Sequence, residues 1–339
     1  MKKLFIISNE SFYNNESGFF CDNLDMKSTP EGLDKKFEVN IIARKSKQIR
    51  THNVNLQNII ICRNILSFLF NIIKSFKEKN SKYLIFSISP YTTLAAIIIK
   101  LFGKNSFVFL RSDGYGEYKA ILGFLGPFIY HPMFYLVSKI SFLISCRKYI
   151  LKRKKGEVVD PSQLTEKWFQ NMKQPNLSEI NLLYVGRIRV EKGIFSLIEM
   201  FNETMEDINL LIVGAEKNLK KIIKKKNINI FEIEKDVNKL INFYDNSNIF
   251  ILPSFTEGHP MTLLEALSRQ RPVIIFNEIK HVVGEKKGIF NCNRDAESLK
   301  KTINYIIKNY HSIQNEMKSN SLPTKDDFLK NISILIENN

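Results

Sequence analysis

Short apolar runs alternate with amphipathic stretches along this chain. The runs are rich in Ile, Leu, Val and Phe and end at polar or glycine-containing segments, as buried strands of a parallel sheet do. Between them, apolar residues recur at helical spacing, as in the stripe of Ile65, Leu69, Ile72, Ile73 and Phe76. The alternation predicts an α/β protein with parallel sheets. Strands are predicted at residues 4–7, 39–43, 58–61, 84–87, 107–110, 182–185, 210–213, 228–231, 249–252 and 273–276.

The length of the chain predicts two domains. It has 339 residues, whereas a single hydrophobic core stops growing at about 250 to 300 residues. The polar stretch 170–179 is the predicted linker. We therefore predict an N-terminal domain over residues 1–169 and a C-terminal domain over residues 170–322. Within residues 323–339, Phe328, Ile332 and Leu335 form an apolar stripe that predicts a terminal helix.

The composition is that of a globular protein, with 44% hydrophobic and 25% charged residues. The cysteines, Cys21, Cys62, Cys146 and Cys292, show neither a C-x-x-C motif nor metal-ligand spacing, which fits a reducing cytoplasm. The apolar run near the N-terminus ends at Ile7 and is too short for a secretory leader. We therefore expect a cytoplasmic protein.

The most informative segment is residues 253–266, PSFTEGHPMTLLEA. Its Pro and Gly indicate a loop after the strand predicted at 249–252, and the leucines that follow open a helix. Backbone N–H groups at a helix start lack intrahelical acceptors and carry about half a positive charge, so they bind anions such as a diphosphate. The carboxylates of Glu257 and Glu265 are then placed to accept hydrogen bonds from sugar hydroxyls.

A second loop, residues 186–193, GRIRVEKG, follows the strand predicted at 182–185. Arg187 offers a planar fork of donors and Lys192 a compact charge, so together they are suited to a pyrophosphate. Gly186 and Gly193 let the backbone approach a ligand closely. The structural alternatives are an ordinary solvated ion pair for the two cations, and acids favoured by the helix dipole for the two glutamates.

The motifs G-R-x-x-x-E-K-G and S-x-x-E-G-x-P, the latter followed by E-A with seven residues between the glutamates, resemble the GT4-like family of retaining glycosyltransferases. The resemblance implies the GT-B fold, in which two Rossmann-like domains face each other. The N-terminal domain would bind the acceptor and the C-terminal domain the nucleotide-sugar donor. The terminal helix would cross back to the first domain.

Residue roles follow from the resemblance by position. It implies that Arg187 and Lys192 bind the donor diphosphate, that Glu265 holds the ribose hydroxyls and that catalytic Glu257 contacts the donor sugar. No cofactor and no metal are implied, because the cations and the helix end stabilise the departing diphosphate. The chain departs from the family at residues 268–272, where a glycine is common. The segment implied to face the sugar and the diphosphate is Gly258, His259, Pro260 and Met261.

In the N-terminal half, Asp113 is the predicted catalytic residue on the acceptor side. It follows the strand predicted at 107–110, at the sheet edge where open α/β sheets bind ligands. Relatives commonly carry a histidine in this neighbourhood, and the alternatives are that Asp113, Arg111 or neither residue takes its role. A turn in which Asp113 caps a backbone amide is the structural alternative.

The net charge of +16 is clustered. An apolar stretch at 120–145 precedes six cations within 147–155, a combination suited to an anionic membrane surface. An internal helix followed by a solvated basic loop is the alternative. Pro127 and Pro132 argue against a transmembrane span. A second cluster of lysines at 217–226 is predicted to be the solvated face of a helix.

The expected function is retaining transfer of a hexose from a nucleotide diphosphate sugar to a saccharide, lipid-linked in a bacterial surface polysaccharide pathway. We expect the protein in the cytoplasm, peripheral to the inner face of the plasma membrane. A GT-B nucleotide-sugar epimerase is the alternative. Nucleic acid is not an expected partner, because the chain shows no basic motif interleaved with aromatics and no helix-turn-helix signature.

Overall fold

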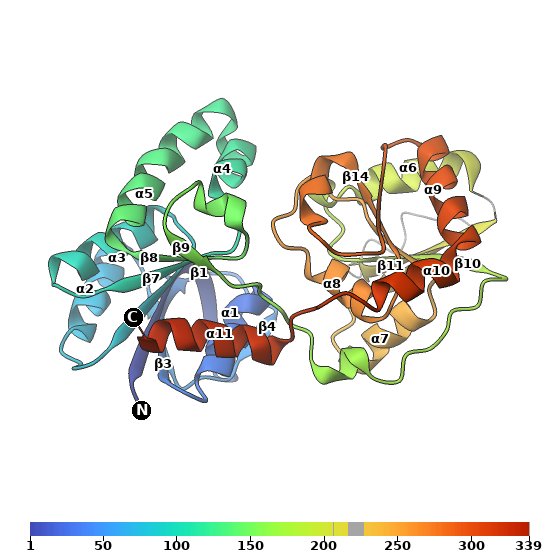
Figure 1. Ribbon diagram of the computed structural model, residues 1–339. Coiled ribbons are helices and arrows are strands. Elements are labelled where there is room, and N and C mark those ends of the chain that lie inside the picture. The colour runs from blue at the N-terminus through green and yellow to red at the C-terminus, as the bar shows by residue number, and fades with distance from the viewer. Residues whose placement is uncertain (206, 216–226, 339) are drawn as a thin grey trace. The chain divides into compact units, whose positions relative to one another are not determined.

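The computed structural model describes residues 1–205, 207–215 and 227–338 and divides the chain into two compact units (Figure 1). Met1–Pro161 and Lys325–Asn339 form the first unit, and Ser162–Thr324 form the second. The boundary lies earlier than the predicted 169/170 because Trp168 packs edge to face on Tyr244 of the second unit, with ring centroids 5.5 Å apart. The lysine cluster predicted at 217–226 lies outside the described residues.

The first unit is built on a nine-stranded sheet. Neighbouring strands in the order β5-β3-β1-β6-β7-β8-β9 are parallel, and the far end of β1 pairs antiparallel with β2, which in turn pairs with β4. All five strands predicted for this half are present. The strand bounds are Lys3–Asn15 (β1), Gly18–Cys21 (β2), Glu38–Lys45 (β3), His52–Val54 (β4), Asn58–Cys62 (β5), Lys82–Phe86 (β6), Ser106–Leu110 (β7), Phe142–Ser145 (β8) and Gly156–Val158 (β9).

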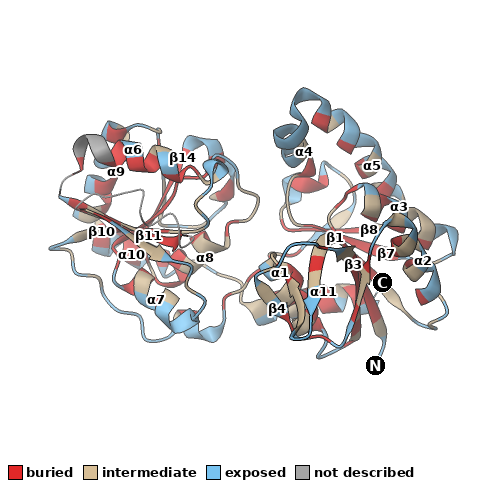
Figure 2. Ribbon diagram, turned by 180° about the vertical axis from the view of Figure 1, so that it is seen from behind, coloured by how far each residue is buried: buried red, intermediate tan, exposed pale blue. Residues whose placement is uncertain are grey.

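Helices cover both faces of this sheet (Figure 2). Alternate residues of β1 point to opposite faces, so Leu4 packs in a core with α1 and α11, and Phe5 in a core with α2, α3 and α5. The terminal helix α11 buries Phe328 and Ile332 in the first of these cores, which confirms the predicted return of the chain. The helices are Leu24–Leu33 (α1), Ile65–Ser75 (α2), Pro90–Leu101 (α3), Gly114–Leu122 (α4), Gly123–Leu125 (η1), Gly126–Ile140 (α5), Lys148–Leu151 (η2) and Lys325–Asn338 (α11).

The second unit holds a six-stranded parallel sheet in the order β12-β11-β10-β13-β14-β15. Its strands are Ile180–Val185 (β10), Ile208–Ala215 (β11), Ile228–Glu232 (β12), Ile249–Leu252 (β13), Val273–Phe276 (β14) and Ile289–Cys292 (β15). Its helices are Glu166–Phe169 (η3), Val190–Lys192 (η4), Ile194–Thr204 (α6), Val237–Asp245 (α7), Met261–Ser268 (α8), Asn277–Val282 (η6), Ala296–Lys308 (α9) and Tyr310–Met317 (α10).

The order of strands in the second sheet reverses between β10 and β13. From β10 the chain proceeds outward through β11 and β12, and it then returns to the other side of β10 at β13. Open α/β sheets bind ligands at such a switch point, beyond the carboxyl ends of the two strands. Both loops singled out in the sequence follow these two strands. The predicted α/β architecture with two parallel sheets is confirmed.

Candidate functional site

The loops after β10 and β13 are in direct contact. Gly193 has a left-handed backbone with φ of 67°, and a Cβ atom placed there would lie 1.9 Å from the Pro253 carbonyl oxygen. The Phe255 N–H donates to the Glu191 carbonyl across the same contact, at 3.0 Å. Only glycine therefore fits at position 193, and its absent side chain is what lets the two loops meet.

This contact brings the two predicted charges together. Lys192 Nζ lies 2.6 Å from Glu257 Oε1, and the two side chains are only 24% and 11% exposed. The Ser254 hydroxyl donates to the same carboxylate oxygen at 2.7 Å. His281 Nε2 lies 2.7 Å from the Glu257 carbonyl oxygen. The Glu257 carboxylate is therefore held in one orientation by a cation and a hydroxyl.

The start of α8 opens on the same space. Pro260 occupies the cap position of α8, and no side-chain hydrogen bond caps this helix. The first backbone N–H groups of α8 are therefore available to a ligand. A cavity of about 320 Å³ lies between this helix start and the β10 loop. The residues that line it are Tyr184, Val185, Gly186, Arg187, Lys192, Leu252, Glu257, His259, Pro260, Met261 and Thr262.

The cavity therefore unites six of the residues predicted from the sequence. Arg187 is exposed at its rim, and the Tyr184 hydroxyl donates to the Arg187 carbonyl at 2.8 Å. Cations from one loop and helix amides from the other face a shared space, which is the arrangement that binds a diphosphate. Gly258 and Glu265 are the predicted members that do not line it.

Glu265 lies further along α8 and is bound by a residue that the motifs did not reveal. The Tyr244 hydroxyl of α7 donates to Glu265 Oε2 at 2.7 Å. Burial raises the pKa of Glu265 to about 7, although the bond from Tyr244 opposes the rise. Tyr244 reads in the sequence as an ordinary apolar position of α7, so only the packing of α7 on α8 identifies it.

Arg294 supports the β13 loop and was also missed. Its guanidinium donates to the Ser254 carbonyl (3.3 Å) and to Ser196 Oγ (3.0 Å), and pairs with Glu278 at 2.7 Å. It also lies over the Phe255 ring, 4.1 Å from the centroid. Arg294 thus joins α6 to the loop that carries Glu257. No local pattern marks it, because its partners are distant in sequence.

In the first unit, Asp113 makes the capping contact that was the structural alternative, and its catalytic role stays a prediction. It caps α4 by accepting from the Tyr115 N–H at 3.2 Å, and its carboxylate pairs with Lys152 Nζ at 3.0 Å. Arg111, at the end of β7, differs from it. Its guanidinium lies 5.5 Å from the centre of the Phe86 ring and 3.6 Å from an Asp25 carboxylate oxygen.

Arg111 has donors left over. Its side chain is 18% exposed, and among the described residues its buried Nε and Nη1 find no hydrogen-bond acceptor. A largely buried guanidinium at the carboxyl edge of a parallel sheet, with Nε lacking an acceptor within the described part of the chain and Nη1 engaged by the Asp25 carboxylate at 3.6 Å, is suited to an anionic group of a ligand. Arg111 therefore stays a candidate for binding in this neighbourhood.

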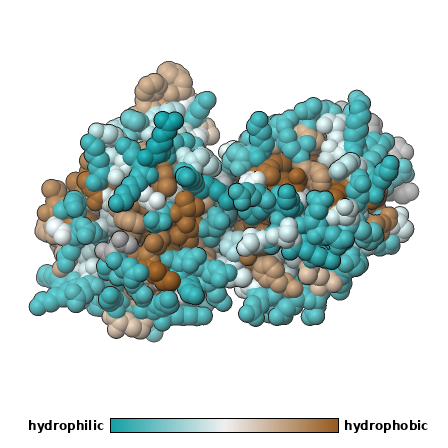
Figure 3. Space-filling view, in the orientation of Figure 1, coloured by the Kyte–Doolittle hydropathy of each residue, from teal (hydrophilic) through white to brown (hydrophobic). Residues whose placement is uncertain are grey.

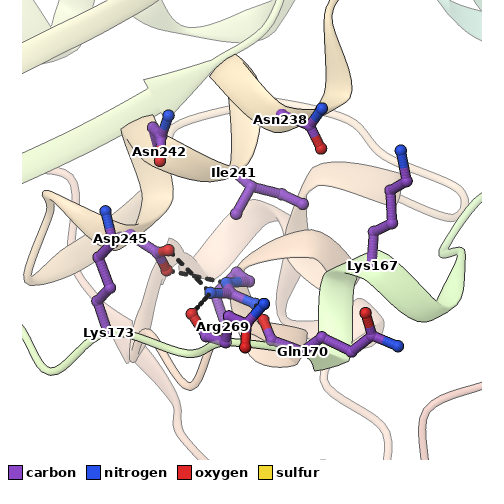
Figure 4. Close-up of a pocket in the computed structure, with 9 residues that line it drawn as sticks. Lys167, Gln170, Lys173, Asn238, Ile241, Asn242, Asp245 and Arg269 are labelled. Atoms are coloured by element: carbon purple, nitrogen blue, oxygen red, sulfur yellow. Dashed lines mark hydrogen bonds and ion pairs between the residues drawn. The ribbon is translucent and has the colours of Figure 1, made fainter.

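The unit that contains Glu257 has a second cavity, of about 350 Å³, and Arg269 is one of the residues that line it (Figure 4). This guanidinium is fully buried and donates to both carboxylate oxygens of Asp245, at 2.9 and 2.8 Å. It also donates to the carbonyls of Trp168, Gln170 and Asn171. Because its donors are satisfied by protein atoms, Arg269 fastens residues 168–171 to α7 and α8 and is a structural clamp.

The clamp lies in the segment where the chain departs from the family motif. Arg271 is also buried and donates to the carbonyls of Tyr244 and Lys173. Between the two arginines, Gln270 has a left-handed backbone with φ of 52°, at the position where the resembled family commonly has glycine. This turn has a left-handed residue other than glycine, and it lies outside the cavity of Arg187 and Lys192.

Parts of the chain are similar to known glycosyltransferases. Residues 166–322 match the model of the family described as glycosyl transferases group 1. An uncharacterised glycosyltransferase of Haemophilus influenzae is 31% identical over 153 residues, which are 40% of this chain and 42% of that protein. The capsular polysaccharide biosynthesis glycosyltransferase CapM of Staphylococcus aureus is 33% identical over 137 residues, 36% of each chain. This chain therefore matches less than half the length of these curated relatives.

Solved structures share the fold over the full chain. Anabaena HepE, solved with UDP and glucose, superposes with a TM-score of 0.69 at 11% identity, covering 100% of both chains. A UDP-N-acetylglucosamine 2-epimerase superposes less closely, with a TM-score of 0.59 at 12% identity over 99% of this chain and 96% of the other. At these identities the likeness concerns the fold.

Proposed function

We propose that the protein, whose residues 166–322 match the model of the group 1 glycosyl transferases, transfers a hexose from a nucleotide diphosphate sugar to a saccharide hydroxyl. The observation that carries the proposal is the cavity in which Arg187, Lys192 and the start of α8 surround one anion-sized space beside Glu257. Transfer proceeds with retention at the anomeric carbon, and the donor needs no protein-bound metal.

Charge development explains why this cavity suits the reaction. As the bond between the sugar and the diphosphate breaks, negative charge grows on the leaving oxygens. Arg187, Lys192 and the N–H groups of α8 are aimed at that charge, and such preorganised groups lower the barrier. Positive charge grows on the sugar ring, where the Glu257 carboxylate stabilises it. The departing phosphate takes the acceptor proton, so we assign no protein base.

In this scheme the Lys192 ammonium interacts with two negative groups, the Glu257 carboxylate and the donor diphosphate. Its ammonium pairs with Glu257 in the cavity, and an incoming diphosphate would share it. The shared ammonium couples the sugar-facing carboxylate to the leaving group. Glu265 holds the ribose through the carboxylate oxygen that does not bind Tyr244, after rearrangement of the cavity wall.

The acceptor is proposed to be a lipid-linked saccharide of a bacterial surface polysaccharide. The name of CapM, a capsular polysaccharide biosynthesis glycosyltransferase, supports a bacterial surface polysaccharide. Arg111 supports it independently, because its Nε has no acceptor among the described residues and its Nη1 has only the Asp25 carboxylate at 3.6 Å, so the guanidinium suits an anionic group such as the phosphate of a lipid carrier. Replacement of Arg111 by Gln should then raise KM for the acceptor with little effect on donor binding.

The first experiment is a thermal-shift panel of UDP- and GDP-sugars. A ligand at 100 times its Kd adds about 2.7 kcal/mol to the free energy of unfolding, so the true donor should stand out. Arg187→Ala should abolish its shift, while Arg189→Ala in the same loop, outside the cavity, should retain it. Unchanged binding in Arg187→Ala would rule out the phosphate assignment.

Transfer is then measured with the identified donor. Proton NMR of the product should show the anomeric configuration of the donor, and EDTA should leave the initial rate unchanged. The epimerase alternative has one supporting observation, the shared fold with a UDP-N-acetylglucosamine 2-epimerase. Release of an epimerised nucleotide sugar without transfer to any acceptor would select that alternative.

A further inference from the structure

Helices α4 and α5 form a hairpin whose two arms are locked together. Tyr115 of α4 packs edge to face on Tyr130 of α5, with ring centroids 4.9 Å apart. A Cβ atom at Gly126 would lie 2.0 Å from the Tyr118 carbonyl oxygen, so α5 begins against the backbone of α4. The tip of the hairpin is therefore held in a fixed position.

The whole stretch Gly114–Ile140 is long and apolar enough to cross a membrane by length and composition. The structure folds it back on itself, because Tyr115 contacts Tyr130, whereas a straight helix would separate these residues by about 22 Å. The arms of 9 and 15 residues would extend about 14 and 22 Å, less than the roughly 30 Å of a hydrocarbon core. The hairpin presents apolar side chains without spanning.

The tip of the hairpin exposes large apolar side chains. Ile121, Phe124 and Phe128 are 75%, 76% and 73% exposed. Figure 2 colours most of this tip as exposed, and Figure 3 shows brown apolar atoms there. Several large apolar side chains gathered at one tip mark an interaction site, whereas single exposed apolar residues do not. Leu122, Leu125 and Ile129 extend the patch.

A basic segment packs beside the base of the same hairpin. Lys152 pairs with Asp113, the residue that caps α4, and Lys154 Nζ lies 5.0 Å from the centre of the Tyr135 ring of α5. Residues of the segment 148–158 line an open cleft of about 1050 Å³. The apolar tip and the basic cleft are therefore parts of one face of the first unit.

Much of this positive charge is not neutralised by the protein. Across the described part of the chain, Lys148, Arg153 and Lys155 have no carboxylate within ion-pair distance. Lys152 and Arg153 are consecutive residues with left-handed backbones, φ 46° and 65°, a conformation that L residues rarely adopt and that tends to occur at functional sites. The fold therefore maintains a strained backbone at Lys152 and Arg153, and most cations of this segment are exposed.

The spacing of the two features fits a lipid interface. Phe128 near the tip and Tyr135 beside Lys154 are seven residues apart on α5, or about 10 Å along the helix. Interfacial elements bury their apolar parts by about 5 to 10 Å. With the tip among the acyl chains, the cations would lie at the level of the lipid phosphates.

We propose that the α4–α5 hairpin and the basic segment 147–155 dock onto a bilayer that contains anionic phospholipid. A second copy of the chain fits this face poorly, because a symmetric contact would bring like charges together. A nucleic acid would use the cations and leave Phe124 and Phe128 in water. An anionic bilayer complements both the charge and the apolar tip.

Vesicle flotation without any donor or acceptor tests this proposal separately from catalysis. The full chain should bind vesicles of phosphatidylcholine with phosphatidylglycerol and bind phosphatidylcholine vesicles much less. The variant K148Q/R153Q/K155Q should lose about fivefold in partition coefficient per cation removed. The variant F124E/F128E should lose at least tenfold. A tryptophan introduced as F124W should be quenched by lipids brominated on the acyl chain.

Two control variants match these changes elsewhere. K280Q/K308Q/K318Q removes three exposed lysines of the second unit, and L66E/F70E changes exposed apolar residues of α2. Both should bind as the unmodified protein does, and circular dichroism should show that every variant is folded. Equal losses in test and control variants, equal binding to neutral vesicles, or no quenching of F124W would overturn the proposal.

Discussion

The Lys192 ammonium lies 2.6 Å from the Glu257 carboxylate, although the two residues are 65 positions apart in the sequence. The pair lies at the switch point of the second sheet, where the loops after β10 and β13 touch. A cation committed to a carboxylate is a weaker partner for a diphosphate than a free one. The affinity of the cavity for a diphosphate therefore depends on how Lys192 is shared.

Substitutions of the two partners should act in opposite directions on nucleotide binding. Glu257→Gln keeps the size of the side chain and frees Lys192, so the nucleoside diphosphate product should bind several-fold more tightly while kcat falls by two orders of magnitude or more. Lys192→Gln should weaken the same binding by about 10- to 100-fold, as expected for a lost charge-assisted bond. Titration calorimetry with UDP and GDP measures both effects. Parallel changes in the two variants would contradict the shared role.

Glu265 should make stability fall as the pH rises. Its folded-state pKa is raised to about 7 from 4.5, so the folded protein binds the extra proton between these values and stability is lost as pH rises from about 4.5 to 7. Glu265→Gln keeps an oxygen acceptor for Tyr244 and has no charge to bury. It should therefore be more stable than the unmodified protein at pH 8, by about 3 kcal/mol, and not at pH 4.5.

Denaturant titrations at the two pH values check this. Tyr244→Phe is the companion variant, because it removes the bond that favours the ionised carboxylate and should steepen the pH dependence. A pH-independent difference between Glu265→Gln and the unmodified protein would show that the residue remains charged throughout. Nucleotide affinity of the same variant tests the proposed ribose contact.

Gly193→Ala should separate the two loops of the cavity. The new Cβ atom would lie 1.9 Å from the Pro253 carbonyl, and the residue would keep a left-handed backbone. We expect a loss of about 2 to 4 kcal/mol in unfolding free energy together with weaker donor binding. Gly103→Ala is the matched control, because its φ of 70° is similar but no atom lies within 4 Å. Equal losses of unfolding free energy in both variants would show that backbone strain, and not the contact with Pro253, causes the loss.

Arg294 should act as a positioning residue. Its guanidinium holds the Ser254 carbonyl and lies over the Phe255 ring, so Arg294→Ala should lower kcat about tenfold with less effect on the affinity for UDP or GDP. Arg294→Lys should not restore the rate, because an ammonium lacks the planar fork. Steady-state kinetics separate the two effects. A purely structural role would lower stability and leave kcat of the folded fraction unchanged.

The sequence alone determined the strands, the two loops and the helix starts of the donor side. Buried parallel strands such as β13 are continuous apolar runs, and the loops carry glycine, proline and charges in fixed order, so both are local patterns. That the two loops form one site was implied by the resemblance of their motifs to the glycosyltransferase family. The strands β2, β4, β8, β9 and β15 escaped prediction. Each has four or fewer residues, and none is an uninterrupted run of Ile, Leu, Val and Phe, as the equally short strands β13 and β14 are.

Only the tertiary structure decided which side chains meet. Tyr244 binds Glu265 because α7 packs on α8, and Arg294 reaches Ser254 across 40 positions of sequence. The capping of α4 by Asp113, and the unsatisfied donors of Arg111, likewise depend on atoms that no local pattern specifies. Secondary structure arises from short-range periodicity, whereas partners, burial and pKa arise from contacts between segments distant in the chain, and those exist only once the sheets have formed.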